Sequence, residues 1–233
     1  MPLLYSRATI SEQRGGFNHG ALNLAHGVKI MKFYNSTGPN PRIVRMFAAE
    51  LNIPLDMVET DIMAGENREA AFLKINPAGQ SPALVLADGQ VITEITAICE
   101  YLDEIHDGDS LIGDDAAARA QTRRWTRWLD LNICELMLDG FRFGEGLPIF
   151  KDRMRCQPEA SDGLKARAQD QMAMLEQRLK DHAYIAGDRM SLADIVGFGM
   201  FDFIQTVGQS LPGDAIHIAA WFEKMSKRPS ASA

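Results

Sequence analysis

The stretch SPALVLADGQVITEITAICEYL, residues 81–102, decides the fold that the sequence predicts. Two short apolar runs flank Asp88 and Gly89, a dipeptide that tolerates the positive φ angles of a tight turn. Apolar residues then recur at helical spacing, namely Ala97, Ile98, Tyr101 and Leu102. The stretch therefore predicts a β-hairpin followed directly by a helix that runs to about Glu104.

Upstream of the hairpin, the pattern predicts strand, helix, strand and helix. An apolar strand covers residues 31–34, and a second strand covers residues 55–60. Between them lies a helix that Pro54 stops, with one apolar face made of Val44, Phe47, Ala48 and Leu51. A short helix at residues 66–76 is closed by Pro77. The predicted order is therefore β-α-β-α-β-β-α, an alternation typical of an α/β domain.

Downstream of the hairpin, the sequence predicts only helices. Long amphipathic stretches cover residues 116–143 and 162–180. Ser191 and Asp194 stand three apart before an apolar run, which is the spacing of a capping box at a helix start. The final helix has an apolar face predicted from three residues at three-residue spacing, namely Ala219, Phe222 and Met225. The second half is therefore expected to be an all-α domain.

These patterns divide the chain into four expected parts. Residues 1–30 are rich in Gly without a sustained period and are expected to form a flexible N-terminal extension. Residues 31–105 carry the α/β domain. Residues 106–115 are rich in Asp and Gly and are expected to be the linker. Residues 116–233 carry the helical domain.

The composition excludes several classes of function. The chain has 233 residues, 46% of them hydrophobic, and a formal net charge of −7, so a basic surface for nucleic acid is not expected. The three cysteines are widely spaced, with no pattern of a metal site or a disulfide framework. No run approaches the roughly 18 apolar residues of a membrane helix. We therefore expect a cytoplasmic protein with no metal, nucleic-acid or membrane partner.

Three local sequences carry a resemblance to a known family: NPAGQSPAL at residues 76–84, TEITAICEYL at 93–102 and YIAGDRMSLADI at 184–195. In this order and at this spacing they resemble the cytosolic glutathione transferases, over essentially all of residues 31–233. The resemblance implies a thioredoxin-like N-terminal domain and a helical C-terminal domain. It also implies glutathione as co-substrate and a homodimer.

The resemblance implies a set of glutathione-binding residues. A cis bond between Ser81 and Pro82 would turn the backbone of Ser81 toward the cysteinyl part of glutathione. Glu94 suits the γ-glutamyl amine, and the helix start behind it offers free N–H groups to the neighbouring carboxylate. The family commonly has Ser after this acidic residue, whereas this chain has Ile95, which leaves only a backbone N–H. Read without the resemblance, Glu94 is an acid that favours the helix dipole.

Two further residues are candidates for the same ligand. Arg68 stands where the family often has a basic residue near the glycyl carboxylate, and it could equally be an ordinary exposed helix charge. Gln80 is a further possible contact, and its alternative role is that of a polar loop residue. Both assignments therefore stay open at the level of sequence.

The residue that activates the glutathione thiol is not evident from the sequence. Gly38 stands where related classes have Ser, and Asn40 stands near the position where another class has Cys. The turn GPNP, residues 38–41, instead resembles a small fungal and bacterial class that lacks a conventional catalytic Tyr, Ser or Cys. This resemblance suggests that amides at the helix start, near Gly38 and Asn40, hold the thiolate.

The second half of the chain offers one cation to the thiol site. The same resemblance places Leu138 and Arg142 where the fungal form has Ser and His. Arg142 could stabilise a thiolate, or it could form a salt bridge between domains or subunits. The hydroxyls of Ser36 and Thr37 are expected to satisfy the backbone of the turn rather than activate the thiol.

The predicted activity is the conjugation of glutathione to a hydrophobic electrophile. An apolar pocket for that electrophile could be lined by Phe141, Phe143, Leu147 and Phe150, although such residues are more often core. Peroxide reduction, dehalogenation and ether cleavage are related activities of the same scaffold. The alternative is a protein that binds glutathione or another ligand without catalysis.

Overall fold

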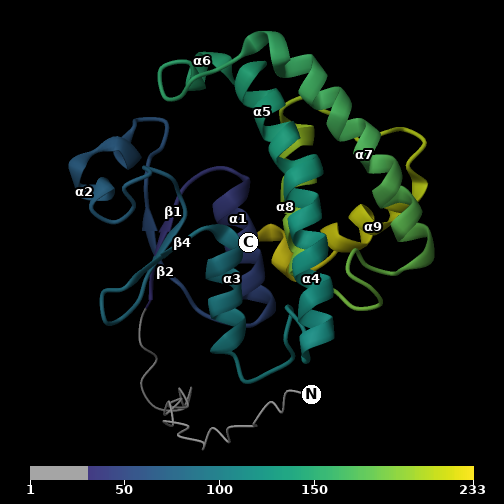
Figure 1. The fold of residues 1–233 in the computed structure, drawn as a ribbon. Helices are drawn as coiled ribbons and strands as arrows, with labels where there is room; N and C mark the ends of the chain where they lie inside the picture. Colours follow the sequence, from purple (N-terminus) through teal and green to yellow (C-terminus); the bar gives the residue numbers. More distant parts are fainter. Residues whose placement is uncertain (1–30) are drawn as a thin grey trace, which may run out of the picture.

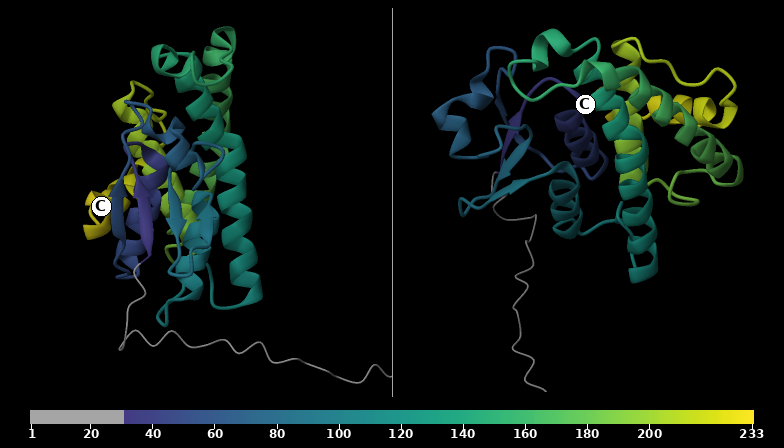
Figure 2. Two further views of the ribbon diagram at one scale, coloured as in Figure 1. Left: turned by 90° about the vertical axis from the view of Figure 1, so that its left-hand side faces the viewer. Right: turned by 45° about the horizontal axis from the view of Figure 1, so that its top comes forward.

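The computed structural model describes residues 31–233, and the predicted N-terminal extension lies outside the described residues. A four-stranded mixed sheet with its helices precedes a bundle of helices, which confirms the thioredoxin-like and all-helical parts (Figure 1). The right-hand view of Figure 2 shows the two parts side by side.

The sheet has the strand order β2-β1-β3-β4. Its strands are β1 (Lys32–Asn35), β2 (Asp56–Glu59), β3 (Ala83–Val85) and β4 (Val91–Thr93). β1 pairs parallel to β2 and antiparallel to β3, and β3 pairs antiparallel to β4 across the predicted hairpin. The register sets Tyr34 opposite Ala83 and Ala83 opposite Thr93. The carboxyl ends of β1, β2 and β4 and the start of β3 therefore meet at one edge of the sheet.

Helices α1 (Pro39–Glu50) and α3 (Ile95–Glu104) lie between the sheet and the helical part (Figures 1 and 2). The predicted face of α1 is confirmed, because Val44, Phe47, Ala48 and Leu51 are all buried. Together with Phe33 and Leu84 of the sheet they join a core that continues into the helical part. The sheet and the helices therefore share one hydrophobic core.

The helix predicted at residues 66–76 is interrupted. A 3₁₀ turn, η1 (Glu66–Arg68), is followed by Glu69 in an extended conformation and by the short helix α2 (Ala70–Leu73). The interruption lets the buried side chain of Asn67 donate from Nδ2 to the carbonyl of Gly79 at 2.6 Å. A long-range hydrogen bond thus competes with a continuous helix.

The helical part contains no strand among the described residues. Its α-helices are α4 (Ala116–Leu129), α5 (Glu135–Phe143), α6 (Leu147–Phe150), α7 (Ser161–Asp181), α8 (Leu192–Thr206) and α9 (Ile216–Ser226), and its 3₁₀ turns are η3 (Pro158–Ala160) and η4 (Pro229–Ser232). The stretch predicted as one helix over residues 116–143 is continuous but includes a π-helical segment, η2 (Asp130–Cys134), between α4 and α5.

The apolar residues predicted for the final helix are confirmed only in part, because Met225 is buried as expected. In α9 the buried residues are Ile218, Trp221 and Met225, whereas Ala219 is exposed and Phe222 is only half-buried. The reason is that Trp221 turns inward and donates from Nε1 to Asp194 at 2.9 Å. One buried hydrogen bond therefore sets the rotation of this helix about its axis.

The predicted capping box at the start of α8 is confirmed. Asp194 is fully buried, and its Oδ2 accepts from the backbone N–H of Ser191 at 2.9 Å and from Ser191 Oγ at 3.0 Å. Its Oδ1 accepts from the N–H of Ile185 at 2.9 Å and from Trp221. Burial raises the pKa of this carboxyl, and the hydrogen bonds oppose the rise.

Helix α8 joins the two parts by packing against α1. A Cβ at Gly199 would lie 2.6 Å from Cγ1 of Ile43, so only glycine permits this approach. At the start of α1, Arg42 pairs with Asp202 of α8 and lies over the ring of Phe198. The position of α1 is therefore fixed by the helical part as well as by the sheet.

The end of α1 is tied to the last described residues. Glu50 lies 2.6 Å from both Nε and Nη2 of Arg228, and it also accepts a hydrogen bond from Ser230 of η4. Its side chain is only 11% exposed. Burial raises the pKa of Glu50, but the hydrogen bonds and charge of Arg228 and the bond from Ser230 outweigh it, so the net pKa is lowered.

We expect Glu50→Gln to lower the free energy of unfolding by about 2 kcal/mol at pH 7, because Arg228 loses its charged partner and is partly exposed. The lowered pKa means that this stabilisation is complete above the ordinary pKa of 4.5 and is lost as the pH falls through the folded value. Urea unfolding at several pH values measures the difference. Glu223→Gln is the control, because Glu223 pairs with Lys227 on the exposed surface. A difference that does not shrink as the pH is lowered would contradict this role.

Candidate active site

The start of α1 faces the edge of the sheet where the strand ends meet. Gly38 is the N-cap residue and has φ 115°, a value that favours glycine. Pro39 and Pro41 occupy the first turn and have no N–H, so the amides near this end belong to Gly38 and Asn40. A helix start carries roughly half a positive charge. It can therefore hold an anion at a small number of defined donors.

Two serines meet beside this turn. Ser36 Oγ donates to Ser81 Oγ at 2.9 Å, and Ser81 Oγ donates to the carbonyl of Tyr34 at 3.3 Å. Ser36 Oγ also lies 3.3 Å from the carbonyl of Thr37, a backbone contact of the kind expected for it. The predicted cis bond between Ser81 and Pro82 is confirmed. The serine chain thus joins the end of β1 to Ser81, two residues before β3.

Glu94 follows β4 and is the N-cap residue of α3, where it is exposed and has φ 68° and ψ 124°. A positive φ is strained for any residue with a Cβ, and such strain occurs most often at functional sites. Ile95 is the first residue of α3, so its N–H is free of the helix hydrogen bonds. Glu94 and Ser81 lie at the same edge, because Thr93 pairs with Ala83.

Arg68 and Gln80 lie on adjoining segments, and both are exposed. Gly79 has φ 63°, and a Cβ there would lie 3.2 Å from both Cδ and Nη1 of Arg68. Asn67 fixes this approach by bonding to the carbonyl of Gly79, and Asn76 Nδ2 donates to the carbonyl of Gln80 at 2.7 Å. The structure therefore brings Arg68 next to the segment that leads to Ser81.

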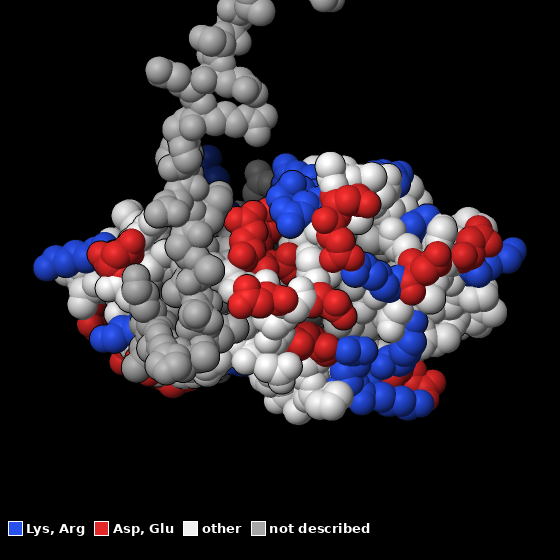
Figure 3. Space-filling view, turned by 90° about the horizontal axis from the view of Figure 1, so that it is seen from below, with Lys and Arg blue, Asp and Glu red and all other residues white. Residues whose placement is uncertain are grey.

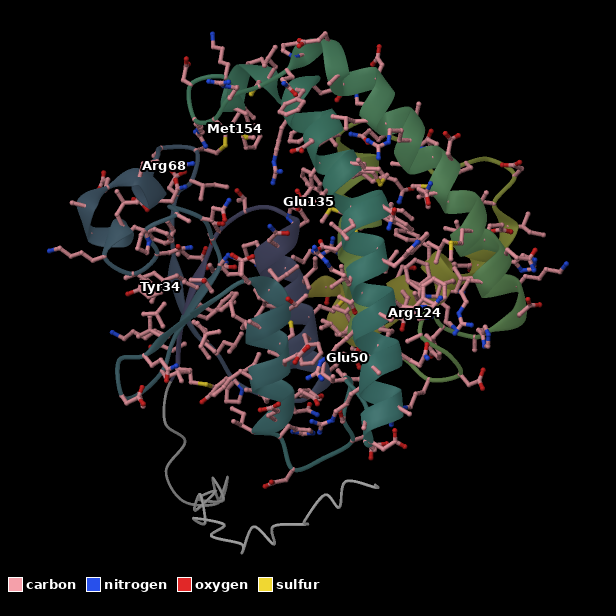
Figure 4. The ribbon with its side chains drawn as sticks, viewed as in Figure 1. Tyr34, Glu50, Arg68, Arg124, Glu135 and Met154 are labelled. Carbon is pink, nitrogen blue, oxygen red and sulfur yellow. The ribbon has the colours of Figure 1, made fainter. Side chains whose placement is uncertain are left out.

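Arg142 lies on α5, in the helical part, and is paired with acids of its own helix. Its Nη1 is 2.9 Å from Asp139 Oδ1 and 3.4 Å from Glu135 Oε2. Figure 4 shows Glu135 on the side of α5 that faces the thioredoxin-like part. Desolvation raises the pKa of Glu135, Arg142 opposes the rise, and Asp130 and Asp139 add to it. The positive charge of Arg142 is therefore largely offset where it stands.

The aromatic residues of α5 and α6 pack on one another. Phe141 makes edge-to-face contacts with Phe150, at 6.0 Å between ring centroids, and with Phe203 of α8, at 5.4 Å. Phe143 is buried. The aromatic residues that were predicted to line a pocket for the electrophile therefore pack against aromatic neighbours or contribute to the core.

Sequence reasoning did not identify Asn67 as a site residue. It is buried, its Nδ2 holds Gly79, and its Oδ1 has no hydrogen-bond partner among the described residues. Its only signal in the sequence is its position beside Arg68, because its partner lies 12 residues away. It fixes the backbone between Arg68 and Ser81.

The protein's own buried thiols are poorly suited to nucleophilic chemistry. Burial raises the pKa of Cys99, with Asp103 and Glu100 adding to the effect. Burial likewise raises the pKa of Cys134, with Asp130 and Glu135 adding to it. Because the thiolate is the nucleophile, these two residues are held in the unreactive form.

The described residues show three further features that bear on function. Between residues 31 and 233 no group of His, Cys, Asp and Glu side chains could hold a metal ion, and no helix is long and apolar enough to cross a membrane. Viewed from below, acidic side chains gather in the middle of the face, with basic ones toward its margins (Figure 3).

Comparison with known proteins places these features in context. The sequence matches two domain families, described as glutathione S-transferase, N-terminal domain, over residues 37–105 and glutathione S-transferase, C-terminal domain, over residues 147–229. It is 30% identical to protein LigF of Sphingobium sp. (strain NBRC 103272 / SYK-6), a beta-etherase, over 86% of this chain and 91% of that protein.

Solved structures show the same relation. A glutathione S-transferase domain-containing protein of Marinobacter aquaeolei VT8 has a TM-score of 0.81 and 32% identity, covering 85% of this chain and 98% of that one. Gtt2 of Saccharomyces cerevisiae has a TM-score of 0.80 and 28% identity, and the match covers 86% of this chain and 98% of that one.

Proposed function

The chain belongs to the glutathione S-transferase family of enzymes, and we propose that it conjugates glutathione to a hydrophobic electrophile. The observation that carries this proposal is the edge of the sheet where Ser81, Glu94 and the start of α1 converge. Two of the residues there, Gly38 and Glu94, hold positive φ angles. At Glu94, which carries a Cβ, this conformation is strained, and such strained backbone is typical of ligand sites.

Glutathione has two carboxylates, one amine and one thiol, and the edge offers a partner of suitable charge for each. The carboxylate of Glu94 pairs with the amine. The N–H of Ile95 and the start of α3 bind the γ-glutamyl carboxylate. The backbone of Ser81 binds the cysteinyl part, and Arg68 with Gln80 binds the glycyl carboxylate.

The thiol then lies at the start of α1, where the amides of Gly38 and Asn40 stabilise the thiolate. The thiolate attacks the electrophilic atom, a carbon–sulfur bond forms, and the bonding electrons of the broken bond leave with the departing group. The thiol proton passes to solvent. Arg142 assists only weakly, because Asp139 and Glu135 offset its charge.

This assignment predicts the pH dependence of kcat/KM in three variants. Ser36→Ala and Thr37→Ala should leave the acidic limb nearly unshifted, because neither hydroxyl is the activator. Arg142→Ala should raise the pH of the acidic limb by less than about one unit, because Asp139 and Glu135 already offset most of the charge that is removed. Initial rates with a general electrophile between pH 5 and 9 measure the limb.

The control for this series is Arg155→Ala, which removes an exposed cation that makes no hydrogen bond or ion pair with the described residues. A rise of about one unit in either hydroxyl variant, equivalent to about 1.4 kcal/mol, would identify that residue as the activator and refute the role of the amides.

The proposed function is tested by glutathione binding together with turnover. The purified protein should bind glutathione in calorimetry and consume it with at least one substrate in a panel of aryl halides, alkyl halides, peroxides and aryl ethers. The ethers belong in the panel because of the similarity to LigF. Binding without any turnover would favour the alternative, a glutathione-binding protein without catalysis.

We also propose that the protein acts in the cytoplasm as a homodimer. Both statements rest on what is general for the family. Sedimentation of the purified protein at micromolar concentration tests the second, and a single species at the monomer mass would refute it.

A further inference from the structure

The helical part reaches across to the thioredoxin-like part through the strap, residues 144–157, which connects α5 toward η3 and includes α6. Arg153 of the strap donates from Nη1 to the carbonyl of Ile62 at 2.8 Å and from Nη2 to the carbonyl of Met63 at 3.2 Å. Both terminal nitrogens of one guanidinium thus hold two successive carbonyls of the other part. A planar fork suits this double contact, which a lysine cannot reproduce.

The turn that Arg153 grips, residues 61–65, is folded by its own hydrogen bonds. Asp61 Oδ1 accepts from the N–H groups of Met63 and Ala64 at 2.8 and 2.9 Å. Glu66 Oε2 accepts from the N–H of Asp61 at 2.7 Å, and the N–H of Glu66 donates to the carbonyl of Asp61 at 3.0 Å. Among the described residues no other donor bonds to the carbonyls of Ile62 and Met63, so both accept from Arg153 alone.

The gripped turn leads directly to Arg68. The N–H of Arg68 donates to the carbonyl of Gly65 at 2.8 Å, and its neighbour Asn67 holds Gly79. Figure 4 shows Met154, which follows Arg153, on the same side of the molecule as Arg68. A displacement of the turn would therefore be passed to Arg68 through a short series of hydrogen bonds.

The other end of Arg153 is anchored in the helical part. Its N–H donates to the carbonyl of Phe150 at 2.8 Å, and Phe150 packs against Phe141, which packs against Phe203 of α8. Lys165 of α7 also bonds to Glu145 in the strap at 2.6 Å. The guanidinium is therefore presented from a supported segment rather than from a free loop.

We propose that Arg153 is a positioning residue for glutathione: by holding the turn 61–65, it keeps Arg68 where the glycyl carboxylate binds. This rests on the proposed function, because it assumes that Arg68 contacts glutathione. The residue that sets this contact then belongs to the helical part, although the contact itself is made by the thioredoxin-like part. We call the contact of Arg153 with the carbonyls of Ile62 and Met63 the clasp. The side chains of Met63 and Met154 beside it are exposed, so the clasp affects the geometry of the turn more than the stability of the fold.

The test uses Arg153→Ala in the full chain, with Arg155→Ala as the matched control and Arg153→Lys as the conservative variant. Without ligand, Arg153→Ala should speed hydrogen exchange at the amides of residues 61–68 while Arg155→Ala does not. It should weaken glutathione binding by about threefold to tenfold in calorimetry. In turnover, Arg153→Ala should raise KM for glutathione with little change in kcat. Arg153→Lys should have values between those of Arg153→Ala and those of the unchanged protein.

Two results would overturn the proposal. Unchanged exchange at residues 61–68 in Arg153→Ala would show that the clasp does not hold the turn. Faster exchange with unchanged glutathione affinity would show that the clasp holds the turn but does not position the ligand. Failure of the unchanged protein to bind glutathione would instead refute the proposed function and with it the ligand part of this inference, while the exchange result would still decide the clasp.

Discussion

Replacing Asp194 with alanine should lower the free energy of unfolding by about 5 kcal/mol, the largest effect that we expect from a single substitution. The carboxylate is fully buried and accepts hydrogen bonds from Ile185, from Trp221 and twice from Ser191. Alanine leaves all of these donors buried without an acceptor. The start of α8, the rotation of α9 and the segment before α8 all depend on this one side chain. Urea unfolding followed by circular dichroism measures the loss.

Asp194→Asn is the informative second variant, because it keeps the volume and one acceptor. It should lose about half as much, since its amide group faces the donors of Ser191. Asp188→Ala, six residues upstream, is the control, because its side chain is 93% exposed. A loss below about 2 kcal/mol for Asp194→Ala would mean that water or neighbouring groups satisfy the donors.

Replacing Glu94 with alanine should weaken glutathione binding by about 1.5 to 3 kcal/mol, or roughly 10-fold to 150-fold, because a charge-assisted hydrogen bond to the amine is lost. Calorimetry at pH 7 measures the change. Glu104→Ala, at the other end of the same helix, removes another exposed acid and should leave the affinity unchanged. An unchanged dissociation constant for Glu94→Ala would remove this residue from the site.

Glu94→Gly separates a binding role from a structural one. Glycine adopts φ 68° without strain, so this variant should be as stable as the unchanged protein or more stable. It should nevertheless bind glutathione as weakly as Glu94→Ala. If Glu94→Gly instead unfolds more readily and binds normally, the residue serves the helix start and not the ligand.

The predictable part of the fold depends on signals that are local in the sequence. Asp88 and Gly89 lie in the turn between β3 and β4, where Gly89 has φ 89°, and Ser191 and Asp194 form their box across one helical turn. The rotation of α9 was not predictable, because Trp221 is turned by a carboxylate 27 residues away. The interruption before α2 has the same origin in the bond from Asn67 to Gly79.

In the candidate site, too, the features with local sequence signals could be predicted, and those that depend on contacts between distant residues could not. The positions of Ser81 and Glu94 were indicated by short motifs, and the confirmed pairing of β3 with β4 is what brings them to one edge. The contact of Ser36 with Ser81 spans 45 residues, and that of Arg153 with Ile62 spans 91. A single sequence does not reveal such pairs, because an Arg or a Ser carries no local pattern that shows which distant residue it contacts.

The π-helical segment at Asp130–Cys134 bears on how this chain can be aligned with its relatives. A π turn is what remains when one residue is inserted into an α-helix, and one residue corresponds to about 100° of rotation. In a homologous protein with a regular helix here, the residue that an ungapped alignment pairs with each position of α5 would point about 100° away. An alignment without a gap at residues 130–134 would pair Leu138 and Arg142 with side chains that point in another direction, so substitutions on α5 are better compared by superposition than by column.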